Sequence, residues 1–424
     1  MKYYPHFGGE WALRIEVTDL FLVILYAYLI KDFITRRLSI QIPAVAIFWL
    51  LLIILGLGSI IFSPYRTMAA YEIISMTKML LLFIYLVNYG KTRNQIKLVV
   101  AALMIGVFLQ IIYGLMQHFC GLNLPLQRLG QSPEMVTEEL GMRTASRVGA
   151  MLGHPNIFAG YLVMLLPLAF ILIFVRISIW YKALCIAILV FGEMALILTL
   201  SRGGWISFAT SVMVILFLRP AVGRQRIITL IFILGSALVI GLLFSGTIIQ
   251  KFILSDPASI SSRVECMYIA WRMIQSNFWW GTGLNSFTFV MSDYDYSGIQ
   301  WGKMDPPVHN IYLLIFAEQG IFGILLFLSI CFMVIRVGIS NLKGKDNLLN
   351  AINLGSLAGF IAILVQGVGD WNLRINTTVR VFWTLAAMIF AIHFWNQKQE
   401  SDKPEIQRRN NFKNISVVSS ASVR

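Results

Sequence analysis

Charged residues are scarce in this chain. Only 13% of its 424 residues are Asp, Glu, Lys or Arg, whereas about a quarter are charged in an average soluble domain. Hydrophobic residues make up 58% of the chain and gather in runs of about 20 residues, long enough to cross the hydrocarbon core of a bilayer. This composition excludes a soluble globular protein and predicts an all-α, polytopic membrane protein.

Acidic residues are scarcer than basic ones, and the net charge is +14. A positive balance can indicate a nucleic-acid partner. Here, however, the Lys and Arg residues are scattered through short loops between apolar runs, which is the topology signal of a membrane protein. We therefore expect membrane lipid around the chain and no nucleic acid.

Cysteines are few, and the chain has four of them. Cys185 and Cys331 fall inside predicted spans, where they are expected to pack. Cys120 and Cys266 both fall in predicted outward loops, so a disulfide between them stays open. No small-residue cleavage site follows the first apolar run, so no cleavable signal peptide is expected.

The apolar runs predict eleven transmembrane helices and two long polar loops. The expected spans are 17–34, 42–62, 68–88, 97–117, 157–175, 183–200, 204–218, 227–246, 309–336, 351–370 and 376–395. The resulting organisation is N-terminal helices at 1–117, a first outward loop at 118–156, central helices at 157–246, a long outward loop at 247–308, C-terminal helices at 309–395 and a basic cytoplasmic tail at 396–424. The tail has no apolar face, so we expect it to lack regular structure.

The distribution of Lys and Arg predicts the orientation of these spans. One set of alternate loops holds 14 basic residues before the tail is counted, whereas the short connections and the N-terminus on the opposite side hold six. Because basic loops stay in the cytoplasm, the tail is predicted to be cytoplasmic and both long loops to face outward. The odd number of spans then places the N-terminus outside.

The segment Ser201–Gly204 (Ser-Arg-Gly-Gly) decides much of this topology. Residues 183–218 could form one long helix, which would invert everything upstream. Gly-Gly favours a turn instead, and a turn places Arg202 within the apolar bundle. A charge there is costly unless it has a partner or a function.

Several polar residues converge on the outward face under this topology. They are Arg143, Arg147, His154 and Asn156 before the fifth span, Arg202 at the turn, Arg263 and Arg272 in the second long loop, and His309 at the next span. Several arginines around one pocket indicate an anionic ligand, because guanidinium groups bind phosphate oxygens bidentately. Taken singly, an arginine at a membrane edge is more often a lipid-headgroup contact or a snorkelling residue.

His309 follows Asp305-Pro306-Pro307 and begins a long apolar helix. The helix dipole at an N-terminus disfavours imidazolium, so His309 is expected to be neutral. A neutral imidazole can act as a general base. The alternative is a histidine that only caps the helix.

Two further patterns have simpler explanations. Asp293-Tyr294-Asp295 resembles a D-x-D metal motif, but short acidic patterns are common in polar loops and we expect no metal here. The other pattern is a set of charges inside spans, which can mark a transport pathway: Glu72, Lys78, Glu193 and Glu318. Internal pairing is the expected role of these four residues.

Four ordered stretches make the chain resemble the O-antigen ligase and O-antigen polymerase superfamily. They are RVGAMLGHPNIFAGYLVMLLP (147–167), LTLSRGGWISF (198–208), SSRVECMYIAWRMIQSNFWWGTGLNSF (261–287) and VHNIYLLIFAEQGIFGILLFL (308–328). The chain departs from the family at Asn277-Phe278, where members often have a proline, and in its eleven spans against twelve typical of the ligases.

The resemblance implies a bacterial inner-membrane glycosyltransferase without cofactor or metal. It implies inverting transfer of a glycan from an undecaprenyl pyrophosphate donor to a hydroxyl of lipid A-core or another anchor. By resemblance, Arg202 and Arg263 hold the pyrophosphate and His309 activates the acceptor. Further substrate-binding candidates are Arg147, Arg143, His154 and Asn310.

Two other functions remain as alternatives. A polymerase would join lipid-linked repeat units by the same chemistry, and the sequence does not separate it from a ligase. A transporter or flippase of lipid-linked sugars would be expected to show inverted repeats and midplane sites, and the sequence shows no such repeat.

Overall fold

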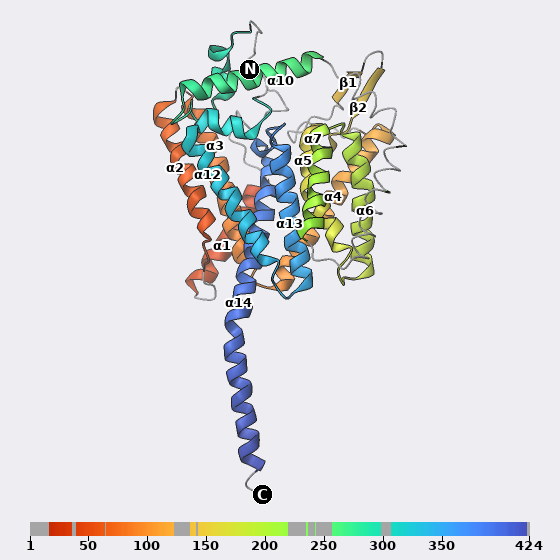
Figure 1. Cartoon of the computed structure of the whole chain (residues 1–424), viewed down its shortest axis with the longest axis vertical. Coiled ribbons are helices and arrows are strands. Elements are labelled where there is room, and N and C mark those ends of the chain that lie inside the picture. Colours follow the sequence, from red (N-terminus) through yellow and green to blue (C-terminus); the bar gives the residue numbers. More distant parts are fainter. Residues whose placement is uncertain are drawn as a thin grey trace.

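A computed structural model describes residues 17–35, 40–63, 65–122, 136–140, 143–218, 257–297 and 307–421, with the single positions 235 and 242. Its long helices are α1 (Val17–Ile34), α2 (Ala44–Phe62), α3 (Arg66–Tyr89), α4 (Arg93–Cys120), α5 (Pro155–Leu172), α6 (Ile179–Leu198), α7 (Arg202–Leu218), α12 (Ile311–Asn341), α13 (Asn347–Gln366) and α14 (Asn376–Ala421). They run side by side as one bundle (Figure 1).

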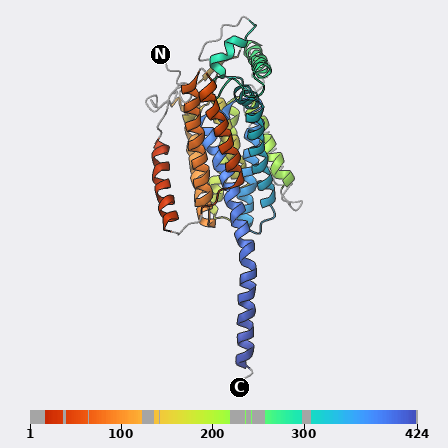
Figure 2. The same cartoon turned by 90° about the vertical axis from the view of Figure 1, so that its left-hand side faces the viewer.

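Eight helices in the described part of the chain are long and apolar enough to cross a membrane. These helices confirm a polytopic membrane protein. Helix α7 falls short at 17 residues, and α1, which carries Asp19, Lys31 and Asp32, lies at the edge of the bundle (Figure 2). The span predicted at 227–246 lies outside the described residues apart from positions 235 and 242.

The centre of the bundle is formed by α5 and α13. Their apolar segments are 94% and 78% buried, against 28–67% for the other spanning helices. The two helices approach closely because α13 presents glycines to α5. A Cβ at Gly355 would lie 2.7 Å from the Cα of Leu168, and one at Gly359 would overlap the carbonyl oxygen of Met164. Small residues are the usual means of such close packing in membranes.

The described parts of the two long polar stretches lie at the same end of the bundle, which we call the upper end (Figure 1). The first contains the antiparallel hairpin of β1 (Val136–Leu140) and β2 (Arg143–Arg147). The second contains α10 (Pro257–Ser276), which lies across the bundle, and the short α11 (Phe287–Val290) and η3 (Met291–Tyr294). The end of α14 projects from the opposite, lower end. Which end faces the cytoplasm stays a prediction.

The chain turns between α6 and α7. Helix α6 ends at Leu198 and α7 begins at Arg202, with Leu200 between them at φ 52°. The hydroxyl of Ser201 accepts the backbone N–H of Gly204 at 3.3 Å. Residues 183–218 are therefore two helices.

The expectation of a tail without regular structure is wrong. Helix α14 continues to Ala421, well beyond the bundle (Figure 2). Extending an existing helix needs no new nucleus, and the Gln, Lys, Glu and Arg residues that follow the span have good helix propensity.

Helix α12 is broken at Gly320, which has φ 66° and ψ −166°. The loop after α10 is hydrogen-bonded across the break. Thr282 N–H donates to the Ala317 carbonyl and Ile321 N–H donates to the Phe278 carbonyl, both at 2.9 Å. We call this arrangement the α12 clasp. It fixes the second long loop to the helix that begins beside His309.

Candidate functional site

Ionisable residues gather at the upper end of the bundle. We call His309, Asp370, Arg147 and Arg263 the charged cluster. His309 precedes α12, and Asp370 lies in the connection between α13 and α14. The His309 Nδ1 and Asp370 Oδ1 atoms are 4.0 Å apart. The two connections are joined by a 2.8 Å hydrogen bond from Ile311 N–H to the Gly367 carbonyl. Two segments about 60 residues apart in sequence thus present an imidazole and a carboxylate to each other.

Asp370 is buried beside two arginines. Burial raises the pKa of its carboxyl to about 6, although the Trp371 N–H, Arg263 and Arg147 all act to lower it. The Trp371 N–H donates to Oδ1 at 2.8 Å. A buried carboxyl whose pKa is shifted by burial and by neighbouring arginines is typical of a functional site.

His309 is largely buried and neutral. Burial, followed by the positive charge of Arg263, lowers the pKa of its imidazole to about 4. Its Nδ1 atom has no hydrogen-bond partner among the described residues. The low pKa therefore comes mainly from burial, and Asn310, not His309, is the N-cap of α12. A neutral imidazole can accept a proton.

Arg147 is anchored where three elements meet. Its Nε donates to the Thr199 carbonyl at 2.9 Å in the α6–α7 turn, and a terminal nitrogen donates to Asn156 Oδ1 at 3.0 Å in α5. The backbone carbonyl of Asn156 accepts the side-chain amides of Asn372 at 2.9 Å and Gln366 at 3.3 Å. Arg147 thereby holds α5 and the turn against the segment that carries Asp370.

Arg263 on α10 belongs to this cluster, and Arg202 begins α7 at the same end of the bundle (Figure 1). Arg263 acts electrostatically on both His309 and Asp370. Arg202 is the first residue of α7 and is partly exposed. The neighbouring Gly203 faces Gln366 at the end of α13. Neither guanidinium forms an ion pair with the described residues, so both are available to an anionic ligand.

Two other substrate-binding candidates, Asn310 and His154, already use side-chain atoms to cap helices. The side-chain oxygen of Asn310 accepts the N–H groups of Tyr312 and Leu313 at 3.0 Å each, which caps α12. His154 Nδ1 accepts the Asn156 N–H at 3.2 Å and caps α5. Arg143 lies four residues before Arg147 on β2, about 13 Å away along a strand. Its side chain is outside the described part.

Arg272 does not join the cluster, contrary to expectation. It pairs with Glu265 at 3.0 Å and donates to the Tyr294 carbonyl at 3.0 Å. These bonds hold η3 against α10. In the D-x-D pattern, Asp295 Oδ1 accepts the Ser297 N–H at 2.8 Å and closes a turn. The described residues contain no cluster of three or more potential metal ligands.

Of the four charges expected to pair inside the spans, Glu72, Lys78 and Glu318 form ion pairs. Arg374 forms ion pairs with Glu318 and with Glu72, the latter at 2.9 Å. Lys78 pairs with Asp19 at 2.9 Å. These contacts tie α3, α12 and the connection after Asp370 together.

Asp370 is the residue that sequence reasoning missed. It is the last residue of the span predicted at 351–370, and so counted as the end of an apolar run. The available signal was an acidic residue at the same end of a span as several arginines, where an unpaired charge is costly.

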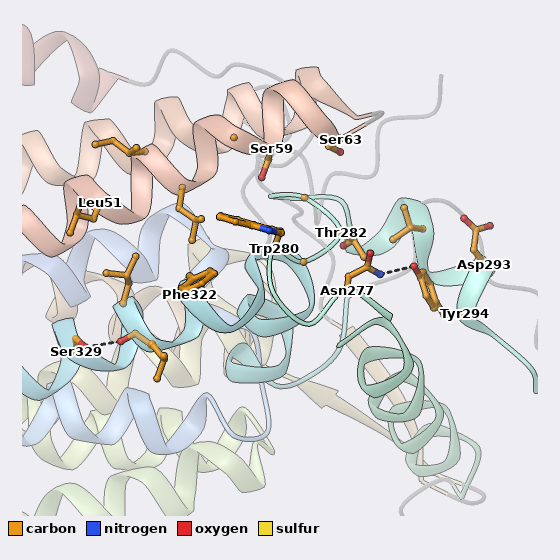
Figure 3. Close-up of a pocket in the computed structure, with 18 residues that line it drawn as sticks. Leu51, Ser59, Ser63, Asn277, Trp280, Thr282, Asp293, Tyr294, Phe322 and Ser329 are labelled. Atoms are coloured by element: carbon orange, nitrogen blue, oxygen red, sulfur yellow. Dashed lines mark hydrogen bonds between the residues drawn. The ribbon is translucent and has the colours of Figure 1, made fainter. Parts of the chain in front are cut away.

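A large cavity lies apart from the charged cluster. It has a volume of about 870 Å³ and lies between α2 and the part of α12 below its break. Trp280, Phe322 and Leu51 line its apolar part, while Asn277 and Tyr294, hydrogen-bonded at 2.8 Å, lie at its polar rim (Figure 3). No member of the charged cluster lines it. Its amphipathic lining suits a lipid chain.

Comparison with known proteins bears on the central part of the chain. Residues 186–328 match a family model described as O-Antigen ligase. No curated protein matches the chain. The matched region contains Arg202, Arg263 and His309, whereas Arg147 and Asp370 lie outside it.

Proposed function

We propose that this membrane protein, which carries an O-antigen ligase family domain at residues 186–328, is a glycosyltransferase acting on the outer face of the bacterial inner membrane. It would transfer a glycan from an undecaprenyl pyrophosphate donor to a hydroxyl of an acceptor such as lipid A-core. The observation that carries the proposal is the neutral His309 beside Asp370, with Arg147 and Arg263 around them.

His309 serves as the general base in this mechanism. Its Nδ1 faces Asp370, so a proton on Nδ1 would leave Nε2 free to accept the proton of the acceptor hydroxyl. Asp370 would then stabilise the imidazolium that forms. A carboxylate that orients a histidine in this way is a recurring arrangement in enzymes.

The arginines stabilise the leaving group. As the acceptor oxygen bonds to the anomeric carbon, the bond from that carbon to the pyrophosphate oxygen breaks. Negative charge then builds on the departing undecaprenyl pyrophosphate. In this proposal the guanidinium groups of Arg202 and Arg263 bind the pyrophosphate and stabilise the charge that develops on it, which lowers the barrier. Direct displacement inverts the anomeric configuration, and no metal is required by these steps.

A polymerase of lipid-linked repeat units would use the same groups, so the acceptor alone distinguishes the two activities. A transporter is disfavoured because Glu72, Glu318 and Arg374 neutralise one another across the bundle.

Reconstitution tests the proposal directly. Purified protein in liposomes is given a lipid-linked glycan and, in parallel, lipid A-core or a second lipid-linked glycan, with EDTA present. We expect transfer with inverted configuration by the wild type and loss of transfer by the double variant R202A/R263A. Transfer that persists in the double variant, or that retains configuration, would contradict the mechanism.

A further inference from the structure

Two adjoining recesses lie at the lower end of the bundle, opposite the charged cluster. One, of about 540 Å³, runs between α4, α6 and α13 and is mainly apolar, with Val100, Met104, Leu184 and Ile352 in its wall. The other, of about 790 Å³, is more polar, with Lys345, Asn347 and Asn350 in its wall. Both have the size typical of ligand pockets, about 300–1,000 Å³.

The recesses meet at two arginines. Arg93, Arg176 and Leu348 line both of them. Arg93 uses its Nε to pair with Asp346 at 2.8 Å, which leaves its terminal nitrogens available. Asp346 is also the N-cap of α13, where it accepts the Leu348 N–H at 2.9 Å. Among the described residues that line the recesses, Asp346 is the one acidic group, and it is already engaged.

Positive charge remains in excess at this junction. Arg176 and Lys97, which lines the apolar recess, are both exposed and form no ion pair with residues that the structure describes. Lys345 adds a further cation to the polar recess. An anionic group placed between the two arginines would be neutralised, with an apolar slot on one side and a polar one on the other.

We propose that these recesses bind an anionic phospholipid of the membrane. The phosphate lies between Arg93 and Arg176, one acyl chain occupies the apolar recess, and the rest of the headgroup occupies the polar recess. Guanidinium groups bind phosphate oxygens bidentately, and basic pockets between transmembrane helices are typical sites for anionic headgroups. The site is at the other end of the bundle from His309, so it does not depend on the proposed transferase function.

The test uses delipidated full-length protein in detergent, with binding followed by native mass spectrometry and thermal unfolding. The probes are phosphatidylglycerol, phosphatidylcholine and water-soluble glycerol phosphate. We expect wild-type protein to bind phosphatidylglycerol and to be stabilised by it, with little response to the other two. The double variant K97Q/R176Q should bind it roughly tenfold or more weakly, because each cation near a membrane surface adds to the attraction.

Two further variants make the result specific. K182Q/K343Q removes the same charge from the same end of the bundle without touching either recess, and should bind as wild type does. A101W fills the wall of the apolar recess and leaves every cation in place, and should lose phosphatidylglycerol binding. Equal binding by K97Q/R176Q and K182Q/K343Q would overturn the proposal. So would equal binding of phosphatidylcholine, or displacement of the lipid by glycerol phosphate at the same concentration.

Discussion

At the scale of the residue, the site depends on one imidazole and one carboxyl whose pKa values have exchanged their usual order. His309 is neutral above pH about 4, and Asp370 is charged above pH about 6. Between pH 6 and 8 the pair therefore has the protonation states that a general base and its orienting carboxylate need. Both shifts come mainly from burial, which penalises the charged form of each group.

The pH dependence of transfer follows from these two values. Loss of the Asp370 charge comes first as the pH falls, so the wild-type rate should decline with a midpoint near 6. In D370N the rate should be lower, and its remaining decline should move toward the His309 value near 4. Single-turnover rates between pH 4 and 8 measure both profiles. A decline near pH 6 that persists in D370N would exclude Asp370 as its cause.

His309 should contribute to the chemical step and little to donor binding. Removing a general base typically costs about 100- to 10,000-fold in rate, so H309A should lose transfer by that amount. Its affinity for the lipid donor should stay close to wild type, because the arginines are intact. Donor affinity and single-turnover transfer, measured in parallel, separate the two roles. A proportionate loss of donor binding would make His309 a phosphate ligand instead.

The arginine at the α6–α7 turn should require its guanidinium group and not only its charge. R202K is expected to lose most activity, since a lysine cannot reproduce bidentate contacts with pyrophosphate. R272K is the matched control, because Arg272 pairs with Glu265 away from the cluster. Both variants should accumulate normally in the membrane. Near wild-type transfer by R202K would favour a lipid-anchoring role for Arg202.

Residue types and their order along the chain were enough to identify Arg202, Arg263 and His309 as candidates. The residues that contact these candidates could not be predicted in the same way. Asp370 reaches His309 only because α13 and α14 return the chain to the upper end, and Arg147 is fixed by a carbonyl of the α6–α7 turn. Contacts of this kind depend on tertiary packing, which a single sequence does not specify.

At the scale of the element, the break in α12 shows what hydrophobic runs do not reveal. The sequence predicts one continuous span at 309–336, and Gly320 lies in it close to another glycine, Gly323. The break is set by the loop after α10, whose Trp279 carbonyl occupies the place of a Cβ at Gly320. Periodicity predicts the helix but not the partner that interrupts it.

Gly320 should therefore tolerate no side chain. G320A places a Cβ against the Trp279 carbonyl and imposes a positive φ on alanine, which typically costs about 1–3 kcal/mol. We expect a lower unfolding temperature in detergent and weaker transfer, because the α12 clasp is disturbed. G58A is the matched control, since a Cβ there meets nothing within 4 Å. If G320A unfolds at the same temperature as G58A, the close approach is not structurally important.

At the scale of the whole molecule, the basic residues separate the two ends of the bundle. The connections between α3 and α4 and between α12 and α13 lie together at the lower end, where Arg93 meets Asp346. The start of α12 and the α13–α14 connection, which carry His309 and Asp370, lie at the upper end with the described parts of both long loops (Figure 1). This separation could be predicted from Lys and Arg counts because the loops alternate along the chain. The charged cluster faces the outside of the cell only if the lower end is cytoplasmic.

Thiol labelling in intact spheroplasts determines which end is outside. Cys120 is exposed, while Cys185, Cys266 and Cys331 are buried, and all four are free thiols. The background is therefore C120S. In it, S297C, and a cysteine placed near Gly130, should react with an impermeant reagent added outside.

Lys343 gives the complementary position at the lower end. It is exposed, close to the start of α13 and remote from the charged cluster. K343C should react only after the membrane is permeabilised, because basic connections are retained in the cytoplasm. The opposite pattern, with K343C labelled in intact cells and S297C protected, would put His309 and its arginines in the cytoplasm. An outward-facing transfer from undecaprenyl pyrophosphate would then be excluded, whatever the chemistry of the cluster.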